Sequence, residues 1–127
     1  MFFSSTRTLR RSVRIVNKHL KLGTYYLDVC ERPIDYEFWY LKEEDIIKLK
    51  IESAQKVLEH CEKYETEIKE TISYIEEVEK GFYYQKIYQS ANWSYAYSLL
   101  KTYLKQIIQP QIRIANKCIE EYGSYES

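Results

Sequence analysis

The sequence contains few of the residues that break or turn a chain. Among its 127 residues there are only three glycines and two prolines, which argues against a fold rich in sheets and tight turns. No apolar run approaches the roughly 18 residues that a membrane-spanning helix requires, so we expect a protein that does not span a membrane. The chain can still bury a core, because 45% of its residues are apolar. We therefore expect a single all-α domain over residues 1–127.

The sequence also lacks the patterns that carry catalysis or metal binding. Its three cysteines, Cys30, Cys61 and Cys118, are far apart and contain no C-x-x-C pair, which predicts free buried thiols in a reducing compartment. His60 and Cys61 are neighbours that diverge by about 100° on a helix, and His19 is expected on the surface. Three separated glycines cannot build a phosphate-binding loop. We expect no enzymatic activity, no catalytic, cofactor-binding or metal-binding residues, no cofactor and no small-molecule substrate.

The zero net charge hides a strong asymmetry along the chain. Residues 1–27 have a balance of +6, residues 28–80 of −8, and residues 81–127 of +2. The first segment is rich in Ser, Thr and Arg and has no acid, which is typical of a mitochondrial transit segment. Its six bases fall within one third of a helix circumference. These bases are Arg7, Arg10, Arg11, Arg14, Lys18 and Lys21.

An apolar stripe lies opposite these bases on the same predicted helix. It consists of Leu9, Val13, Val16, Leu20 and Leu27. The pattern predicts one amphipathic helix over residues 6–31, capped by Ser5 or Thr6 and ended by Pro33. Three interpretations stay open: an import signal, a basic helix that binds phosphate, or a bundle helix with a solvated face. Because the stripe continues beyond the bases, we expect the helix to be kept in the mature protein.

A long acidic helix is predicted over residues 35–80, with Asp35 as its cap. From Ala54 onward the apolar residues recur at intervals of three and four, close to a heptad seam. Glu and Lys residues lie between them at i,i+4 spacing. The pattern leaves open whether this helix is continuous or breaks once near residues 52–55. Gly81 predicts a C-terminal cap and a turn.

The third predicted helix is aromatic and covers residues 82–109, and Pro110 kinks or restarts it before a short extension over 111–122. Its apolar residues form two stripes on roughly opposite faces. One stripe holds Tyr84, Ile87, Tyr88, Ala91, Tyr95 and Leu99. The other holds Phe82, Trp93, Tyr97, Leu100, Leu104 and Ile107. Either both are buried in the chain's own bundle, or one meets a partner, with Tyr84, Tyr88 and Tyr95 as candidate contacts.

The order of several short motifs resembles one protein family. Leu27, Asp28 and Val29 precede Glu31 and Pro33, and Tyr36 leads the next helix. Further along, these residues follow in the family's order: Ile75, Glu76, Glu77, Gly81, Ile87, Gln89, Ser90 and Asn92. In these features the chain is similar to the small matrix-arm accessory subunit of mitochondrial complex I (alpha-subcomplex subunit 5, B13 type). It departs from the family in a longer second helix and in its aromatic residues at 93, 95 and 97. The resemblance implies a non-catalytic stabilising subunit without its own cofactor.

These observations predict a three-helix bundle with a long antiparallel hairpin that turns at Gly81. The expected function is that of a non-catalytic accessory subunit of complex I, which stabilises its assembly for respiratory electron transport on the matrix side of the mitochondrial inner membrane. Its partners would be other subunits of the complex. The alternatives are an RNA-contacting accessory protein of the mitochondrial ribosome, an accessory subunit of another respiratory complex or of ATP synthase, and a free adaptor. The neutral balance and the acidic second helix argue against nucleic acid as a partner.

Overall fold

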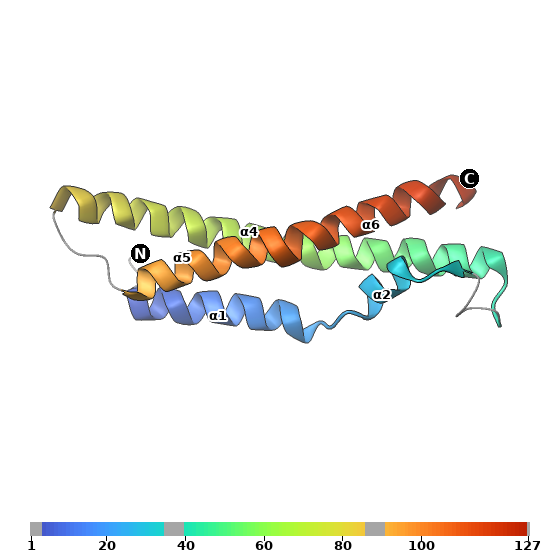
Figure 1. Ribbon diagram of the computed structural model, residues 1–127, viewed down its shortest axis with the longest axis horizontal. Coiled ribbons are helices and arrows are strands. Elements are labelled where there is room, and N and C mark those ends of the chain that lie inside the picture. The colour runs from blue at the N-terminus through green and yellow to red at the C-terminus, as the bar shows by residue number, and fades with distance from the viewer. Residues whose placement is uncertain (1–3, 35–39, 86–90, 127) are drawn as a thin grey trace. The chain divides into compact units, whose positions relative to one another are not determined.

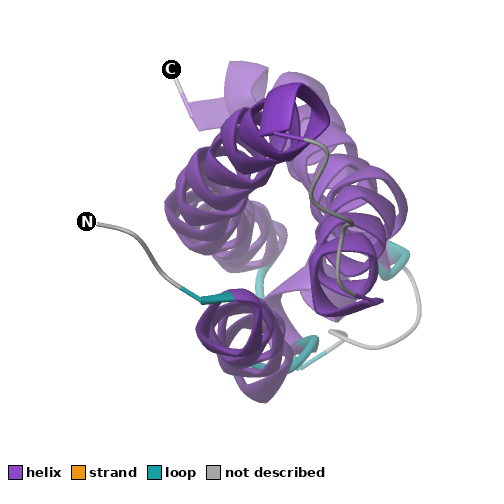
Figure 2. Cartoon of the chain, turned by 90° about the vertical axis from the view of Figure 1, so that its left-hand side faces the viewer, coloured by secondary structure: helices purple, strands orange, loops and turns teal. Residues whose placement is uncertain are grey.

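The computed structural model describes residues 4–34, 40–85 and 91–126, and for residues 79–85 and 125–126 it describes the backbone alone. The described elements are α1 (Ser5–Lys21), α2 (Tyr25–Glu31), α4 (Glu43–Gln85), α5 (Ala91–Tyr103), the π-helical η1 (Leu104–Ile108), α6 (Gln109–Tyr122) and the 3₁₀-helical η2 (Gly123–Glu126) (Figure 1). Helices make up nearly all of these ranges, and no strand occurs within them (Figure 2). The predicted all-α fold class is confirmed.

The chain divides into two compact units, and each of them contains part of α4. The first unit comprises residues 1–22 and 63–107, and the second comprises residues 23–62 and 108–127. In the first unit α1 packs against α5, and in the second α2 packs against α6 (Figure 1). The single helical domain expected from the sequence stays a prediction.

The first predicted helix, over residues 6–31, is wrong as a continuous element. The side chain of Ser4 caps α1 by accepting a hydrogen bond from the backbone N–H of Arg7 at 3.1 Å. The helix ends where Gly23 adopts a φ of +75°, a left-handed conformation that glycine reaches without the strain a Cβ would add. After this interruption α2 runs to Glu31, and the extended backbone of Arg32 fits the restriction that Pro33 places on the residue before it.

The acidic helix is continuous, so α4 does not break near residues 52–55. The predicted start at Asp35 lies outside the described residues. At the other end, the turn predicted at Gly81 is wrong, because α4 passes through this residue and ends at Gln85. Glycine lowers helix stability by about 1 kcal/mol relative to alanine, but it does not forbid a helical backbone. Residues 82–85, which the sequence assigned to the third helix, therefore belong to α4.

The heptad seam of α4 is present in the structure. Four residues at intervals of seven have 0% exposed surface: Ala54, Cys61, Ile68 and Ile75. A second row at intervals of seven is also buried, and it consists of Lys50, Val57, Tyr64 and Thr71. These two rows form the buried stripe that a heptad repeat places on one side of a helix. The stripe contains one residue that is costly to bury, the charged Lys50.

The aromatic helix begins among the described residues at Ala91, and α6 reaches Tyr122 with Pro110 in its first turn. A missing backbone N–H is harmless in a first helical turn. The π-helical η1 comes directly before it, and this wider turn adds one residue to the helix. Leu100, Leu104 and Ile108, which lie before and within this segment, are all buried.

The buried face of α1 is more polar than the sequence predicts. It consists of Thr8, Ser12, Ile15, Val16 and His19. Of the predicted apolar stripe, Val16 is buried, whereas Val13 and Leu20 are exposed. The expected surface position of His19 is wrong, since this side chain is buried against α4 and α5. The amphipathic pattern correctly predicted a helix here, but the face that it predicted to be buried is rotated toward the leucines relative to the face that is buried.

Candidate functional site

In the first unit, a groove with one exposed aromatic residue lies on α5 and η1. Tyr95 is 61% exposed, and it borders a groove of about 280 Å³. The groove is lined by Tyr95, Ser98, Leu99, Thr102, Tyr103, Gln106 and Ile107. These residues recur at helical spacing along one side of the helix, so they can meet an elongated partner such as another helix. We call this set of residues the α5 groove.

The structure separates the two apolar stripes of the predicted aromatic helix. Trp93, Leu100 and Leu104 belong to one stripe, and all three are buried. Ala91 and Tyr95 of the other stripe are exposed, and Tyr95 lines the α5 groove. Of the other candidate contacts, Tyr88 lies outside the described residues, and of Tyr84 only the backbone is described.

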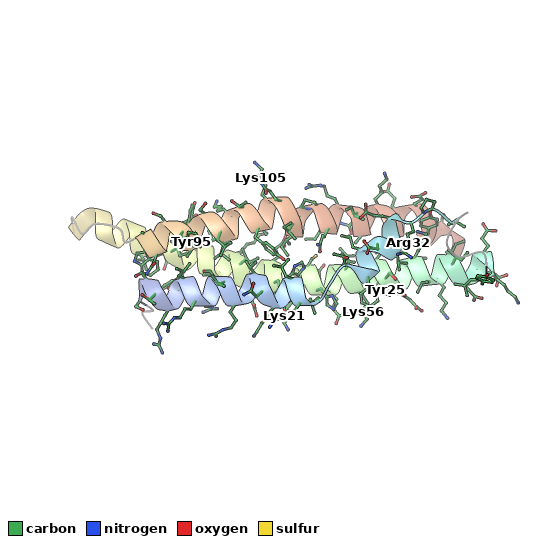
Figure 3. All side chains as sticks on the ribbon, turned by 60° about the horizontal axis from the view of Figure 1, so that its bottom comes forward. Lys21, Tyr25, Arg32, Lys56, Tyr95 and Lys105 are labelled. Atoms are coloured by element: carbon green, nitrogen blue, oxygen red, sulfur yellow. The ribbon has the colours of Figure 1, made fainter. Side chains whose placement is uncertain are left out.

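Two lysines are exposed on the helix that carries the α5 groove, although neither of them lines it. Lys101 and Lys105 are exposed on α5 and η1, and the side chain of Lys105 points away from the helix (Figure 3). The Lys101 ammonium lies 5.4 Å from the centroid of the Tyr97 ring. No acidic residue occurs in the described part of this helix before Ile112. Tyr97 also donates a hydrogen bond from its hydroxyl group to Oε1 of Glu76 on α4 at 3.3 Å, so both a base and an acid lie beside this ring.

The arginine side of α1 forms a second candidate surface in the first unit. Four arginines line a crevice of about 420 Å³: Arg7, Arg10, Arg11 and Arg14. They lie on one side of the helix at intervals of three, one and three residues, and α1 has no acid in its first turn. Guanidinium groups at this spacing suit phosphate or carboxylate groups. The predicted clustering of these bases on one side of a helix is confirmed.

A buried polar contact joins α1 to α5 within the first unit. Nδ1 of His19 and the hydroxyl group of Tyr103 form a hydrogen bond. The His19 ring also makes edge contacts with the rings of Tyr64 and Tyr103, with 5.5 Å between the centroids in each pair. This contact satisfies polar groups that would otherwise be buried without partners. Its role is to position α1 on the helices that carry the α5 groove.

In the second unit, Lys50 is buried at the end of α2. Its side chain is 1% exposed, and its ammonium donates hydrogen bonds to the carbonyl oxygens of Val29 at 2.7 Å, Cys30 at 3.4 Å, and Arg32. These carbonyls lie at the C-terminal end of α2, where the helix dipole favours a cation. The Lys50 ammonium also lies 5.3 Å from the centroid of the Tyr122 ring. Burial lowers the pKa of Lys50 from its usual 10.5.

Two of the three cysteines lie beside Lys50. All three cysteines are buried and reduced, as predicted. Cys30 donates a hydrogen bond to Cys118, which raises the pKa of Cys30 and lowers the pKa of Cys118. The Lys50 ammonium also lowers the pKa of Cys118, and burial opposes this shift. The Cys118 thiol lies 3.6 Å from the carbonyl oxygen of Lys50, to which it donates.

Sequence reasoning missed this group, although one signal was present. Lys50 precedes Val57 by seven residues, so it lies on the heptad seam extended toward the N-terminus. A charged residue at a seam position is costly unless it finds partners. The partners here are carbonyls of another helix, and their positions follow from the fold alone.

Among the described residues, no group of three or more His, Cys, Asp or Glu side chains is placed to hold a metal ion. Likewise, none of the helices in the described ranges is both long and apolar enough to cross a membrane.

Comparison of the chain with known proteins finds no matching family model, no matching curated protein and no matching solved structure.

Proposed function

We propose that this chain is a non-catalytic accessory subunit that stabilises a larger protein assembly, with mitochondrial complex I as the first candidate. The observation that carries the proposal is the α5 groove, where Tyr95 is 61% exposed while Trp93 and Leu100 of the same helix are buried. Tyrosine suits protein interfaces because its ring buries a large area while its hydroxyl group keeps a hydrogen bond. The proposed location is the matrix side of the mitochondrial inner membrane.

Two further features support a binding role. Lys101 and Lys105, which are exposed on the helix that carries the groove, would attract an acidic partner before contact and orient it. The resemblance of the Leu27–Asp28–Val29 segment and the later short motifs to a complex I accessory subunit names the first assembly to examine. The proposed occupant of the groove is an amphipathic helix of a neighbouring subunit with acidic residues flanking its apolar side.

The test is to replace Tyr95 and follow assembly. Tyr95→Asp should reduce co-migration with complex I on native gels at least 10-fold, because the introduced carboxylate would be buried in the interface. Helicity of the isolated chain should stay unchanged, since Tyr95 is exposed. Tyr25→Asp is the matched control, because Tyr25 on α2 is 62% exposed and lies away from the groove residues in sequence. Equal effects of both variants would refute the groove as the interface.

Complexome profiling of the wild-type chain tests the assembly itself. Co-migration with complex I is expected. Migration as a free monomer would contradict an accessory role, and migration with another respiratory complex or with ATP synthase would move the assignment to that assembly.

A second candidate function, an RNA-contacting accessory protein of the mitochondrial ribosome, is favoured by the arginines of α1. Arg7, Arg10, Arg11 and Arg14 line one crevice, and bases at helical spacing suit a phosphate backbone. Replacing all four by Gln separates the two functions. If the chain binds RNA through these arginines, the slope of its logarithmic salt dependence should fall by about 0.7 to 0.9 for each phosphate group that the variant leaves unbound. Co-migration with complex I that survives these replacements would favour the first proposal.

A further inference from the structure

Cys30 and Cys118 come from helices far apart in the sequence and meet in the second unit. Cys30 is a buried residue of α2, and Cys118 is a buried residue of α6. The two helices pack against each other. Their thiols share a hydrogen bond. Lys50 contacts both cysteines. Its ammonium lies 3.4 Å from the carbonyl oxygen of Cys30, and its carbonyl oxygen lies 3.6 Å from the Cys118 sulfur.

We propose that Cys30 and Cys118 form a reversible oxidation site, at which a hydroperoxide converts the two thiols into a disulfide that links α2 to α6. Because the two thiols share a hydrogen bond and lie on helices that pack against each other, the S–S bond needs only a small rearrangement of side chains. The neighbouring Lys50 ammonium supplies the positive charge that favours a thiolate.

Cys118 is the attacking sulfur and Cys30 the resolving one. The Cys118 thiolate attacks one peroxide oxygen, the O–O bond breaks, and the departing oxygen takes up a proton to give an alcohol or water. The resulting sulfenic acid on Cys118 is then attacked by the sulfur of Cys30. The S–S bond forms, and the hydroxyl group leaves as water with the proton of Cys30. The two thiols thus lose two electrons in total and one hydroperoxide is reduced. A dithiol later reduces the disulfide to two thiols and is itself oxidised to a disulfide.

The third cysteine has different surroundings and provides an internal comparison. Cys61 lies on α4, has no exposed surface, and donates a hydrogen bond to Oε1 of Gln111 at 3.4 Å. An amide oxygen cannot form a bond with an oxidised sulfur in the way that a second thiol does. We therefore expect Cys61 to stay reduced under conditions that join Cys30 to Cys118.

Access to the pair requires a local opening, because Cys30 is 9% and Cys118 is 3% exposed. α2 has only seven residues, and short peripheral elements open at a lower free energy than the whole fold. Oxidation should therefore be slower than that of an exposed thiol, and it should speed up at low denaturant concentrations that leave the global fold intact.

The experiment uses the full reduced chain, treated with hydrogen peroxide, alkylated and digested with trypsin. The three cysteines fall in separate peptides, residues 22–42, 57–63 and 118–127, because the Arg32–Pro33 bond resists cleavage. The expected product is a cross-link between peptides 22–42 and 118–127 that dithiothreitol removes. Its formation should raise the thermal midpoint by about 5 to 15 °C, since the bond closes a loop of almost 90 residues.

Two cysteine variants test which thiols take part in the cross-link. Cys61→Ser should still form the cross-link, whereas Cys30→Ser should stop at sulfenic or sulfinic acid on Cys118. A cross-link that involves Cys61, a bond between two chains, or equal oxidation of all three thiols would overturn the proposal. So would the absence of a cross-link after prolonged treatment of the folded wild type. The wild-type peptide map decides the matter even if a variant fails to fold.

Discussion

Replacing Lys50 by methionine tests how a buried charge is accommodated on the seam of α4. Methionine has nearly the same length and helix propensity as lysine, so the change leaves the volume and the backbone preference almost unaltered. It removes the ammonium that binds the carbonyl oxygens of Val29, Cys30 and Arg32. These carbonyls belong to the C-terminal end of α2, which would lose its cap.

The magnitude follows from two opposing effects. A buried carbonyl left without a donor costs about 1–3 kcal/mol, and the carbonyls of Val29 and Cys30 belong to buried residues. Against this, the variant no longer transfers a charge from water to the protein interior. The desolvation cost that it avoids is several kcal/mol, and this offsets part of the loss. We expect a net loss of about 2–4 kcal/mol, a large fraction of the 5–15 kcal/mol typical of a folded domain.

Urea denaturation followed by circular dichroism at 222 nm measures this loss. Lys48→Met is the matched control, because Lys48 is an exposed lysine on the same helix, and it should change the free energy of unfolding by less than about 0.5 kcal/mol. Equal stability of Lys50→Met and the wild type, or a more stable Lys50→Met, would refute the reasoning. Such a result would mean that desolvation of the ammonium outweighs all of its hydrogen bonds.

Four further predictions, one on pH and three on substitutions, can be tested by urea denaturation. Burial lowers the pKa of Lys50, so the unfolded chain keeps the Lys50 proton to higher pH than the folded chain does. The free energy of unfolding of the wild type, relative to that of Lys50→Met, should therefore rise as the pH approaches 10.5 from below. A fall would contradict the lowered pKa. Gly23→Ala should cost about 1–2 kcal/mol through its positive φ, and Asn at this position should cost less. Thr8→Val should stabilise by about 1 kcal/mol, since the buried Thr8 hydroxyl has no hydrogen-bond partner among the described residues; a decrease in stability would show that it is bonded. Leu100→Ala should cost about 2–5 kcal/mol, and Leu99→Ala, at a half-buried neighbour, clearly less.

The helical class and the seam of α4 could be predicted from the sequence because both depend on local periodicity. Residues such as Ile68 and Ile75 repeat at a spacing that only a helix places on one side. The end of α2 before Pro33 was predictable for a similar reason, since the restriction acts on the neighbouring residue. Burial of the three cysteines follows from the same general preferences.

The errors concern places where tertiary contacts decide between local alternatives. Gly23 and Gly81 are both glycines within helical patterns, yet Gly23 adopts a positive φ and Gly81 continues a helix. His19 lies among bases in the sequence, but its partner Tyr103 comes from 84 residues further along. Neither choice is encoded in the neighbouring residues.

The candidate site was predictable in part. The two-sided aromatic pattern left open whether both stripes are buried within the chain, and the structure leaves Tyr95, one of the residues named, exposed. The position of Lys50 on the heptad seam can be derived from the sequence, but its carbonyl partners have no sequence signature. Pairing Cys30 with Cys118 likewise requires the packing of α2 on α6.

The π-helical segment has a consequence for the history of the chain. Leu100 and Ile108 are fully buried and eight residues apart, with the segment Leu104–Ile108 between them. Deletion of a residue elsewhere in a helix rotates every later side chain by about 100°. Here the deletion of one residue would convert the π-helical turn into an ordinary α-helical turn, so the side chains after it would keep their orientation. The segment therefore has the form of an inserted residue.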